Sequence, residues 1–328
     1  MKSRQEVVEL VRAKVRLKHY SLATEDAYTW WAGKYYDHCL NLRASLPPER
    51  KMESFLTYLA VHRNIAARTQ AQAFNALVFL YEQVLGVELG EINALRAKRP
   101  AHERSAPSRE QVRRFRAAVV DAPHTPARLL VDLLYGCGLR VSEPLELRIK
   151  DVLWADGKNG HLMIRSAKGG KDRRVPLPVT CIRPLREQIA RARAVWTDDR
   201  SNFPDVGVTL PHQLGRKYPR HAFSWQWFWV FPAAAHCLHP RTGVRVRYHL
   251  LIDALQRAVH AAATRVELQG LITPHVLRHA YATHSREPIE TLREIMGHVS
   301  IETTSGYRHP VLDRASNPLD DLVAPEPP

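Results

Sequence analysis

ITPHVLRHAYATH, residues 272–284, predicts a helix whose start is defined by its first residues. Thr273 is a good N-cap residue, and Pro274 is tolerated at the first helical position. His275 and Arg278 then lie one turn apart on the same face. The positive end of a helix favours anions such as phosphate. The stretch therefore indicates an anion site; the alternative is a polar helix with structural histidines.

GCGLRVSEPLEL, residues 136–147, predicts a sharp turn followed by a helix. Its glycines allow the turn, Ser142 is expected to cap the helix, and Pro144 falls in the first turn. Arg140 and Glu143 are three residues apart and are expected to pair. The alternative interpretation is an ordinary surface ion pair.

MGHVSIETTSGYRH, residues 296–309, places Tyr307 among small polar residues. A core tyrosine usually has apolar neighbours three or four positions away. Those positions here include two threonines and a proline, so we expect the hydroxyl to be held out for use. His298 lies nine residues earlier.

HLMIRS (161–166) and RVPLP (174–178) predict a β-hairpin with a glycine pair in its turn. Lys168 and Lys171 lie in that turn. A basic turn is often only a solvated turn, and the two lysines are not distinguished by sequence alone.

Together these stretches supply the groups that phosphoryl transfer without a metal needs. No cluster of Asp and Glu of the kind that holds Mg²⁺ accompanies them. Two arginines can clamp the non-bridging oxygens, a histidine can help to remove a proton, and a lysine can protonate the leaving oxygen. Nearby cations favour the phenolate form of tyrosine. The hypothesis is that Tyr307 attacks a DNA phosphodiester, with no metal and no cofactor.

Composition points to a polyanionic partner. The chain has 328 residues, 45% hydrophobic residues, a net charge of +15 and a pI of about 9.9. A well-packed basic protein usually binds nucleic acid, although a ribosomal or membrane-surface protein has similar bulk properties. Four scattered cysteines without C-x-x-C spacing favour neither a zinc site nor a disulfide framework. We find no apolar signal core or membrane-length apolar run and expect a cytoplasmic protein.

Periodicity predicts a helical first quarter, residues 1–94. Helices are expected at 4–19, after Thr24 as N-cap, and at 67–85. The last of these places four side chains on one buried stripe: Phe74, Leu77, Val78 and Tyr81. A charged, proline-containing linker follows at 95–106, and residues 107–328 mix helix and strand, with a helix at 249–265.

The tryptophan-rich stretch SWQWFWVF, residues 224–231, is expected to be a strand with one aromatic face. Its alternating residues are Trp225, Trp227, Trp229 and Phe231. Arginines and lysines flank it, and aromatics among cations suit stacking of unpaired bases. The alternative is that these rings form the core of an added subdomain.

GLRVSE (138–143), HVLRHAYATH (275–284) and GHVSIETTSGY (297–307) resemble, in order, three signatures of the tyrosine recombinase (phage integrase) family. The resemblance implies a mainly α fold with a small β component. It would comprise a helical core-binding (SAM-like) domain and a mixed α/β catalytic domain, forming a C-shaped DNA clamp. It also implies a catalytic set, with Glu143 in support: Arg140, Lys168, His275, Arg278, His298 and the nucleophile Tyr307.

A long segment at about 197–248 resembles the insertion of integron integrases, as do AQAFNALVFLYEQVLG (71–86) and SLATEDAYTWW (21–31). This implies recombination of cassette sites folded as single-stranded hairpins, besides duplex sites. The expected base contacts are Trp225, Trp227 and His249, and the further expected DNA contacts are Arg216, Lys217, Arg241, Arg245 and Arg247.

By resemblance, a bacterial, nucleoid-associated monomer would assemble into a homotetramer on two sites. Its tail, residues 311–328, would pack on a neighbour. The rivals are a phage-type or Xer-type recombinase on duplex sites, a type IB topoisomerase, and a DNA-binding relative with weak or lost catalysis. Two departures from the family pattern are a shortened segment, SREPIETLREIMG (285–297), and Ser305-Gly306 before the tyrosine. The first is expected to change the approach to His298, and the second to loosen the helix around Tyr307.

Overall fold

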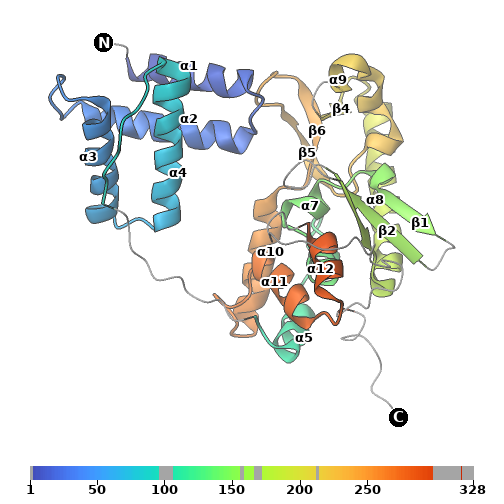
Figure 1. Ribbon diagram of the computed structural model, residues 1–328. Helices are drawn as coiled ribbons and strands as arrows, with labels where there is room; N and C mark the ends of the chain where they lie inside the picture. The colour runs from blue at the N-terminus through green and yellow to red at the C-terminus, as the bar shows by residue number, and fades with distance from the viewer. Residues whose placement is uncertain are drawn as a thin grey trace. The chain divides into compact units, whose positions relative to one another are not determined.

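The computed structural model describes residues 3–95, 106–155, 159–165, 172–211, 214–297 and Leu319 (Figure 1). The chain divides into two compact units, Met1–Glu103 and Arg104–Pro328. The predicted linker, 95–106, lies almost entirely outside the described residues, and the predicted domain limits and clamp shape stay predictions.

The first unit is a helical bundle, as predicted. Its elements are α1 (Arg4–Leu17), α2 (Leu22–Cys39), α3 (Pro48–Val61), α4 (Ala67–Val78) and the π-helical η1 (Phe79–Leu85). α1 packs on α2, and α4 packs on both α2 and α3. The core is built from apolar side chains of all five elements, with Val15, Met52 and Leu77 fully buried.

Two local predictions in this unit are wrong. Ser21, not Thr24, caps α2: its hydroxyl accepts a hydrogen bond from the Thr24 backbone N–H at 3.1 Å. Phe74 is 36% exposed, because the buried face of α4 runs through Gln70 instead. The Gln70 amide is satisfied there by the backbone carbonyls of Leu56 and Leu95.

The second unit mixes helices with two small sheets, which confirms the predicted mainly α class with a β component. Its helices are α5 (Arg109–Ala118), α6 (Ala127–Gly136), α7 (Ser142–Leu145), η2 (Ile149–Asp151), α8 (Val179–Asn202), α9 (Leu214–Lys217), η3 (Pro219–Phe223), η4 (Trp225–Trp227), α10 (Ile252–Arg265), α11 (Pro274–His284) and α12 (Ile289–Met296). α6 is buried on nearly every side and packs against α5, α8, α10 and α11, so it is the central helix.

The first sheet contains the predicted hairpin. Its strands are β1 (Val152–Ala155), β2 (Asn159–Ile164) and β3 (Arg173–Pro176), all antiparallel in that order. α8 runs beside this sheet (Figure 1). The hairpin turn, with Lys168 and Lys171, lies outside the described residues.

The second sheet belongs to the predicted insertion. Its strands are β4 (Gly207–Val208), β5 (Pro232–Leu238) and β6 (Arg245–His249), with β6 in the centre, parallel to β4 and antiparallel to β5. The predicted aromatic strand is wrong. Residues 225–227 form the 3₁₀ turn η4, while Trp229 and Phe231 are buried. The alternating aromatic residues therefore do not form one face of a strand. The first two lie in a 3₁₀ turn, and the last two lie in the core.

Candidate active site

Arg140 and Glu143 form the predicted pair at the turn after α6. The Arg140 guanidinium donates to Glu143 Oε1 at 2.7 Å, and its backbone N–H donates to Oε2 at 2.7 Å. The predicted Ser142 cap is wrong: Val141 holds the N-cap position in helical conformation, without a side-chain cap bond. Glu143 thus ties the turn together from both backbone and side chain, which fixes the direction of Arg140.

Arg278 comes from α11, which begins as predicted with Thr273 as N-cap and Pro274 at its first position. Its side chain is 4% exposed. The guanidinium donates to the carbonyls of Gly138 and Met296, both at 2.6 Å. Burial, followed by the neighbouring charge of Arg140, lowers the pKa of Arg278 to about 10, so it remains charged at neutral pH.

Arg173, which sequence reasoning missed, completes the cluster from the first residue of β3. Its Nη1 and Nη2 donate to the two oxygens of Glu143 at 2.9 and 2.6 Å, and its Nε donates to the Ile295 carbonyl at 2.6 Å. The available signal was strand alternation: Arg173 shares a face with buried Val175, whereas Arg174 between them is exposed.

The C-terminal end of α12 is held by all three arginines. Gly297 ends the helix in the left-handed conformation, with φ +61°. Three successive carbonyls each accept from a different guanidinium, those of Ile295, Met296 and Gly297 from Arg173, Arg278 and Arg140 in that order. His298 follows Gly297 directly in the chain.

The cluster carries a surplus of positive charge. Three guanidinium groups surround the one Glu143 carboxylate, which leaves a net charge of +2. Burial opposes ionisation of Glu143, but its bonds to Arg173 and Arg140 outweigh burial, so its pKa is lowered and it stays ionised. Arg140 keeps 27% of its side chain exposed. The arrangement can therefore attract an anion to Arg140.

The remaining predicted catalytic residues are placed only in part. His275 lies at the second position of α11 with an exposed side chain. Lys168, His298 and Tyr307 lie outside the described residues, so their convergence with Arg140 and Arg278 stays a prediction.

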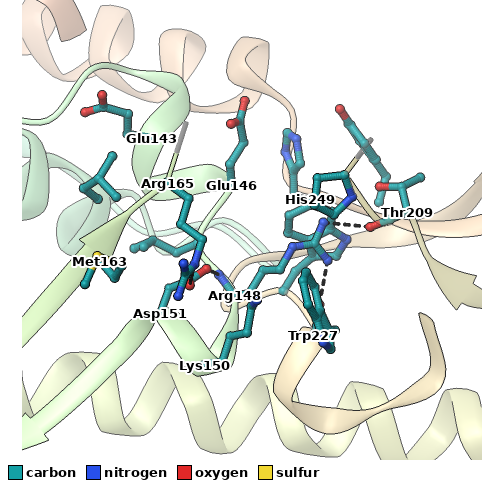
Figure 2. Close-up of a pocket in the computed structure, with 15 residues that line it drawn as sticks. Glu143, Glu146, Arg148, Lys150, Asp151, Met163, Arg165, Thr209, Trp227 and His249 are labelled. Carbon is teal, nitrogen blue, oxygen red and sulfur yellow. Dashed lines mark hydrogen bonds and ion pairs between the residues drawn. The ribbon is translucent and has the colours of Figure 1, made fainter. Parts of the chain in front are cut away.

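A cavity of about 260 Å³ lies beside this cluster, between the first sheet and the insertion (Figure 2). Glu143, Trp227 and His249 are among the residues that line it. Figure 2 shows Arg148 reaching across it, where its guanidinium donates to the carbonyls of Trp227 and Thr209, both at 2.7 Å.

Aromatic rings and cations alternate along the wall of this cavity. Arg148 lies 3.7 Å from the centre of the Trp229 ring, and the Lys150 ammonium lies 3.2 Å from that of Trp227. Trp227 and Trp225 are both half-buried. Trp227 stacks on His221 at 5.9 Å, and Trp225 packs against Trp196 and Phe228. Trp227 lines the cavity and Trp225 is not among its lining residues, so a base that enters the cavity meets Trp227.

Two of the expected DNA contacts are buried inside the insertion. Asp199 holds Arg247 in a bidentate ion pair at 2.5 and 2.9 Å, and the Arg247 side chain is 6% exposed. His249 is buried, and its Nδ1 bonds to the Leu250 carbonyl at 2.8 Å. We therefore no longer expect Arg247 to contact DNA, and His249 could meet a base only from inside the cavity.

The other cations of the insertion are nearer the surface. Arg216, Lys217 and Arg245 are exposed and Arg241 is half-buried. Arg245 lies over the ring of Phe203 at 5.2 Å, so its direction is partly fixed. The three exposed side chains, Arg216, Lys217 and Arg245, are accessible to phosphate.

Comparison with known proteins decides the family. The model of the phage integrase family matches residues 108–313, and the model of the phage integrase N-terminal SAM-like domain matches residues 7–91. The chain belongs to the phage integrase family. Its members include the tyrosine recombinases, and relatives of this chain carry that name, so the protein is a tyrosine site-specific DNA recombinase, as the sequence motifs predicted.

Its relatives cover nearly the whole chain. An integrase/recombinase of Escherichia coli is 38% identical over 92% of this chain and 89% of its own length. Tyrosine recombinase XerA of Pyrococcus furiosus is 27% identical over 93% and 89%.

Solved structures show the same fold at low identity. A lambda integrase dimer bound to a COC′ core site has a TM-score of 0.59 and 14% identity, covering 93% of this chain and 98% of that one. The structure of XerH bound to its palindromic difH substrate has a TM-score of 0.58 and 18% identity, and the match covers 91% of this chain and 78% of that one.

The described residues contain no group of three or more His, Cys, Asp or Glu side chains placed to hold a metal ion. Among them, too, no helix combines the length and apolar character that crossing a membrane requires.

The recombinase should lose stability as pH falls through the histidine range. Burial lowers the pKa of His38, His239, His249 and His284. The unfolded chain, with histidine pKa values near 6.5, then binds more protons than the folded chain. Stability therefore decreases as the pH is lowered. We expect the urea midpoint to drop as the pH falls below about 6.5 toward the lowered pKa values of the folded chain.

Substitution separates the contribution of His249 from the rest. His249→Gln should flatten the pH dependence, whereas His260→Gln, at an exposed position of α10, should leave it unchanged. A midpoint that stays level or rises as pH falls would contradict the expectation.

Proposed function

We propose that this recombinase is of the integron type and that Tyr307 is its nucleophile. The observation that carries the chemistry is the convergence of Arg140, Arg278 and Glu143 at the end of α12, one residue before His298. This convergence supports the proposal that the three groups belong to one catalytic site.

In this proposal Arg140 and Arg278 bind the non-bridging oxygens of the scissile phosphate. Arg140 has an exposed face, and two of the five N–H donors of Arg278 are used in its two carbonyl bonds. The surplus charge stabilises the additional negative charge that develops as the phosphorus is attacked. Glu143 keeps the Arg140 guanidinium directed and does not contact the phosphate.

The reaction conserves the phosphodiester energy. The Tyr307 oxygen bonds to phosphorus with loss of its proton, assisted by His275 or His298, while the bond to the 5′ oxygen breaks. Lys168 gives a proton to that oxygen. The products are a 3′-phosphotyrosyl link and a free 5′-hydroxyl, and attack by a second strand's 5′-hydroxyl reverses the step. No metal or cofactor takes part in this proposal.

The integron assignment rests on the insertion and its cavity. Trp227 presents part of its ring beside Lys150, and His249 lines the same space. We propose that a base displaced from a folded single-strand hairpin enters there and stacks on Trp227. Exposed Arg216, Lys217 and Arg245, with Arg241, would hold the neighbouring phosphates.

The assembly is also part of the proposal. We expect residues 1–94 and 107–328 to close around DNA as a C-shaped clamp. Four protomers would join two sites, with the tail at 311–328 packed on a neighbour.

Covalent trapping tests the proposal. Protein is mixed with a labelled hairpin carrying a cassette-type site, or with the matching duplex, and separated on a denaturing gel. We expect an adduct on the hairpin that Tyr307→Phe lacks. Trp227→Ala should weaken hairpin cleavage and spare duplex cleavage, because the loss of base stacking affects the hairpin alone.

Other outcomes support the rivals. An adduct on duplex alone would favour the Xer type, to which the similarity with XerA already points. DNA binding without any adduct would favour a relative that has lost catalysis.

A further inference from the structure

Arg173 links three parts of the candidate active site, yet the proposed mechanism gives it no role. It starts β3, immediately after the hairpin turn that carries Lys168. Its guanidinium binds both oxygens of Glu143 and the carbonyl of Ile295 in α12. One side chain therefore joins the hairpin, the Arg140 turn and the helix that leads to His298.

The bonds of Arg173 distinguish it from the two arginines of the proposed phosphate site. Its side chain is about as buried as that of Arg278, at 5% against 4% exposed, but Arg278 donates to protein only from its two Nη atoms. All three nitrogens of Arg173 donate to protein oxygens. A Cβ at Gly297 would lie only 3.1 Å from its Cδ, so the guanidinium packs closely along the end of α12. Any effect on the reaction must act through its partners.

We propose that Arg173 is a positioning residue for strand cleavage. It holds the Glu143 carboxylate in the orientation that directs Arg140. It also holds the C-terminal end of α12, which directly precedes His298 in the chain. This inference rests on the proposed function, because it assumes that Arg140 contacts the scissile phosphate.

The geometry requires an arginine. A planar guanidinium donates two parallel bonds to one carboxylate and a third, from Nε, to a separate carbonyl. The ammonium of lysine is a point donor and cannot span both partners. Arg173→Lys therefore keeps the charge and loses the bridge. Arg174→Lys changes the exposed neighbour on the same strand, whose bond to His161 at 2.8 Å is one that a point donor can also make, and serves as the matched control.

The test measures single-turnover cleavage with saturating DNA. We expect Arg173→Lys to have a lower melting temperature, because buried bonds to Glu143 and Ile295 are lost, to remain folded at the assay temperature with an unchanged Kd for DNA, and to cleave about 100-fold more slowly, the scale of a misplaced reacting group. Arg174→Lys should match wild type in all three. A second variant, Arg173→Gln, keeps a planar amide donor without the charge and the bridge; it should give the same pattern and keeps the test decisive if Arg173→Lys unfolds.

A neutral substrate distinguishes positioning from a general structural role. A methylphosphonate at the scissile position has a methyl group in place of one charged oxygen, so a well-directed arginine clamp contributes less to its cleavage. The loss caused by Arg173→Lys should then shrink to about 10-fold or less. Equal losses on both substrates would show that Arg173 merely supports the fold.

The failures can be told apart. Wild-type activity together with normal cleavage by Arg173→Lys overturns the inference alone. An inactive wild-type protein, with no adduct on hairpin or duplex, overturns the proposed function as well.

Discussion

Arg140→Lys is expected to cleave its DNA site roughly 10²–10³-fold more slowly than the wild-type recombinase, the usual effect of losing one preorganised donor to a developing anion. Arg140 divides its guanidinium among Glu143, the Gly297 carbonyl and, in the proposal, the phosphate. A lysine ammonium cannot serve three such directions at once. Single-turnover cleavage at saturating DNA measures the loss, and the Kd should change little.

The control is another arginine–glutamate pair three residues apart, which lies on the surface. Arg113 also pairs with a glutamate three residues away, Glu110, at 2.7 Å, but both side chains are about 60% exposed. Such surface pairs contribute little, so Arg113→Lys should cleave normally. Equal cleavage by wild type and Arg140→Lys would show that Arg140 does not bind the scissile phosphate.

Gly138→Ala is expected to destabilise the second unit by roughly 2–5 kcal/mol, combining backbone strain with overpacking. Gly138 has φ +59°, and an added Cβ would lie 2.5 Å from the Tyr281 ring. Tyr281 is 1% exposed, so the ring has little room to move. The Gly138 carbonyl also accepts from Arg278, so cleavage should fall with stability. Urea unfolding and adduct formation measure the two effects.

Gly270→Ala isolates the backbone part of that cost. Gly270 has φ +81°, but nothing lies within 4 Å of an added Cβ. It should lose only about 1–2 kcal/mol, the usual cost of a left-handed backbone for a residue with a side chain. If Gly138→Ala proved no more damaging than Gly270→Ala, the close contact with Tyr281 would not limit this turn.

Local chemistry made much of the cluster predictable. Arg140 and Glu143 are three residues apart on one turn, and Thr273-Pro274 defines the start of α11 without help from the rest of the fold. Such features depend on neighbours in the chain, which the sequence shows directly. The family motifs then predicted the fold class, because the resemblance implies the fold of the whole family.

Arg173 escaped prediction because its partners lie far away in the chain. Glu143 is 30 residues away from it and Ile295 is 122 residues away, so no local pattern connects them. The strand predicted at residues 224–231 in the insertion was wrong for a related reason. Alternating aromatics suggest a strand, but Trp229 is buried over the guanidinium of Arg148, a contact between distant segments.

The arginine anchors at the end of α12 also determine where the chain can tolerate changes in length. The segment from His284 to His298 was expected to disturb the approach to His298 because it is short. The three carbonyl bonds fix the exit of α12 at residues 295–297, whereas its entry at Pro288 has no side-chain cap. Residues gained or lost at 285–288 therefore alter only the path between α11 and α12. Residues gained or lost after Gly297 would alter the tether to Tyr307 itself.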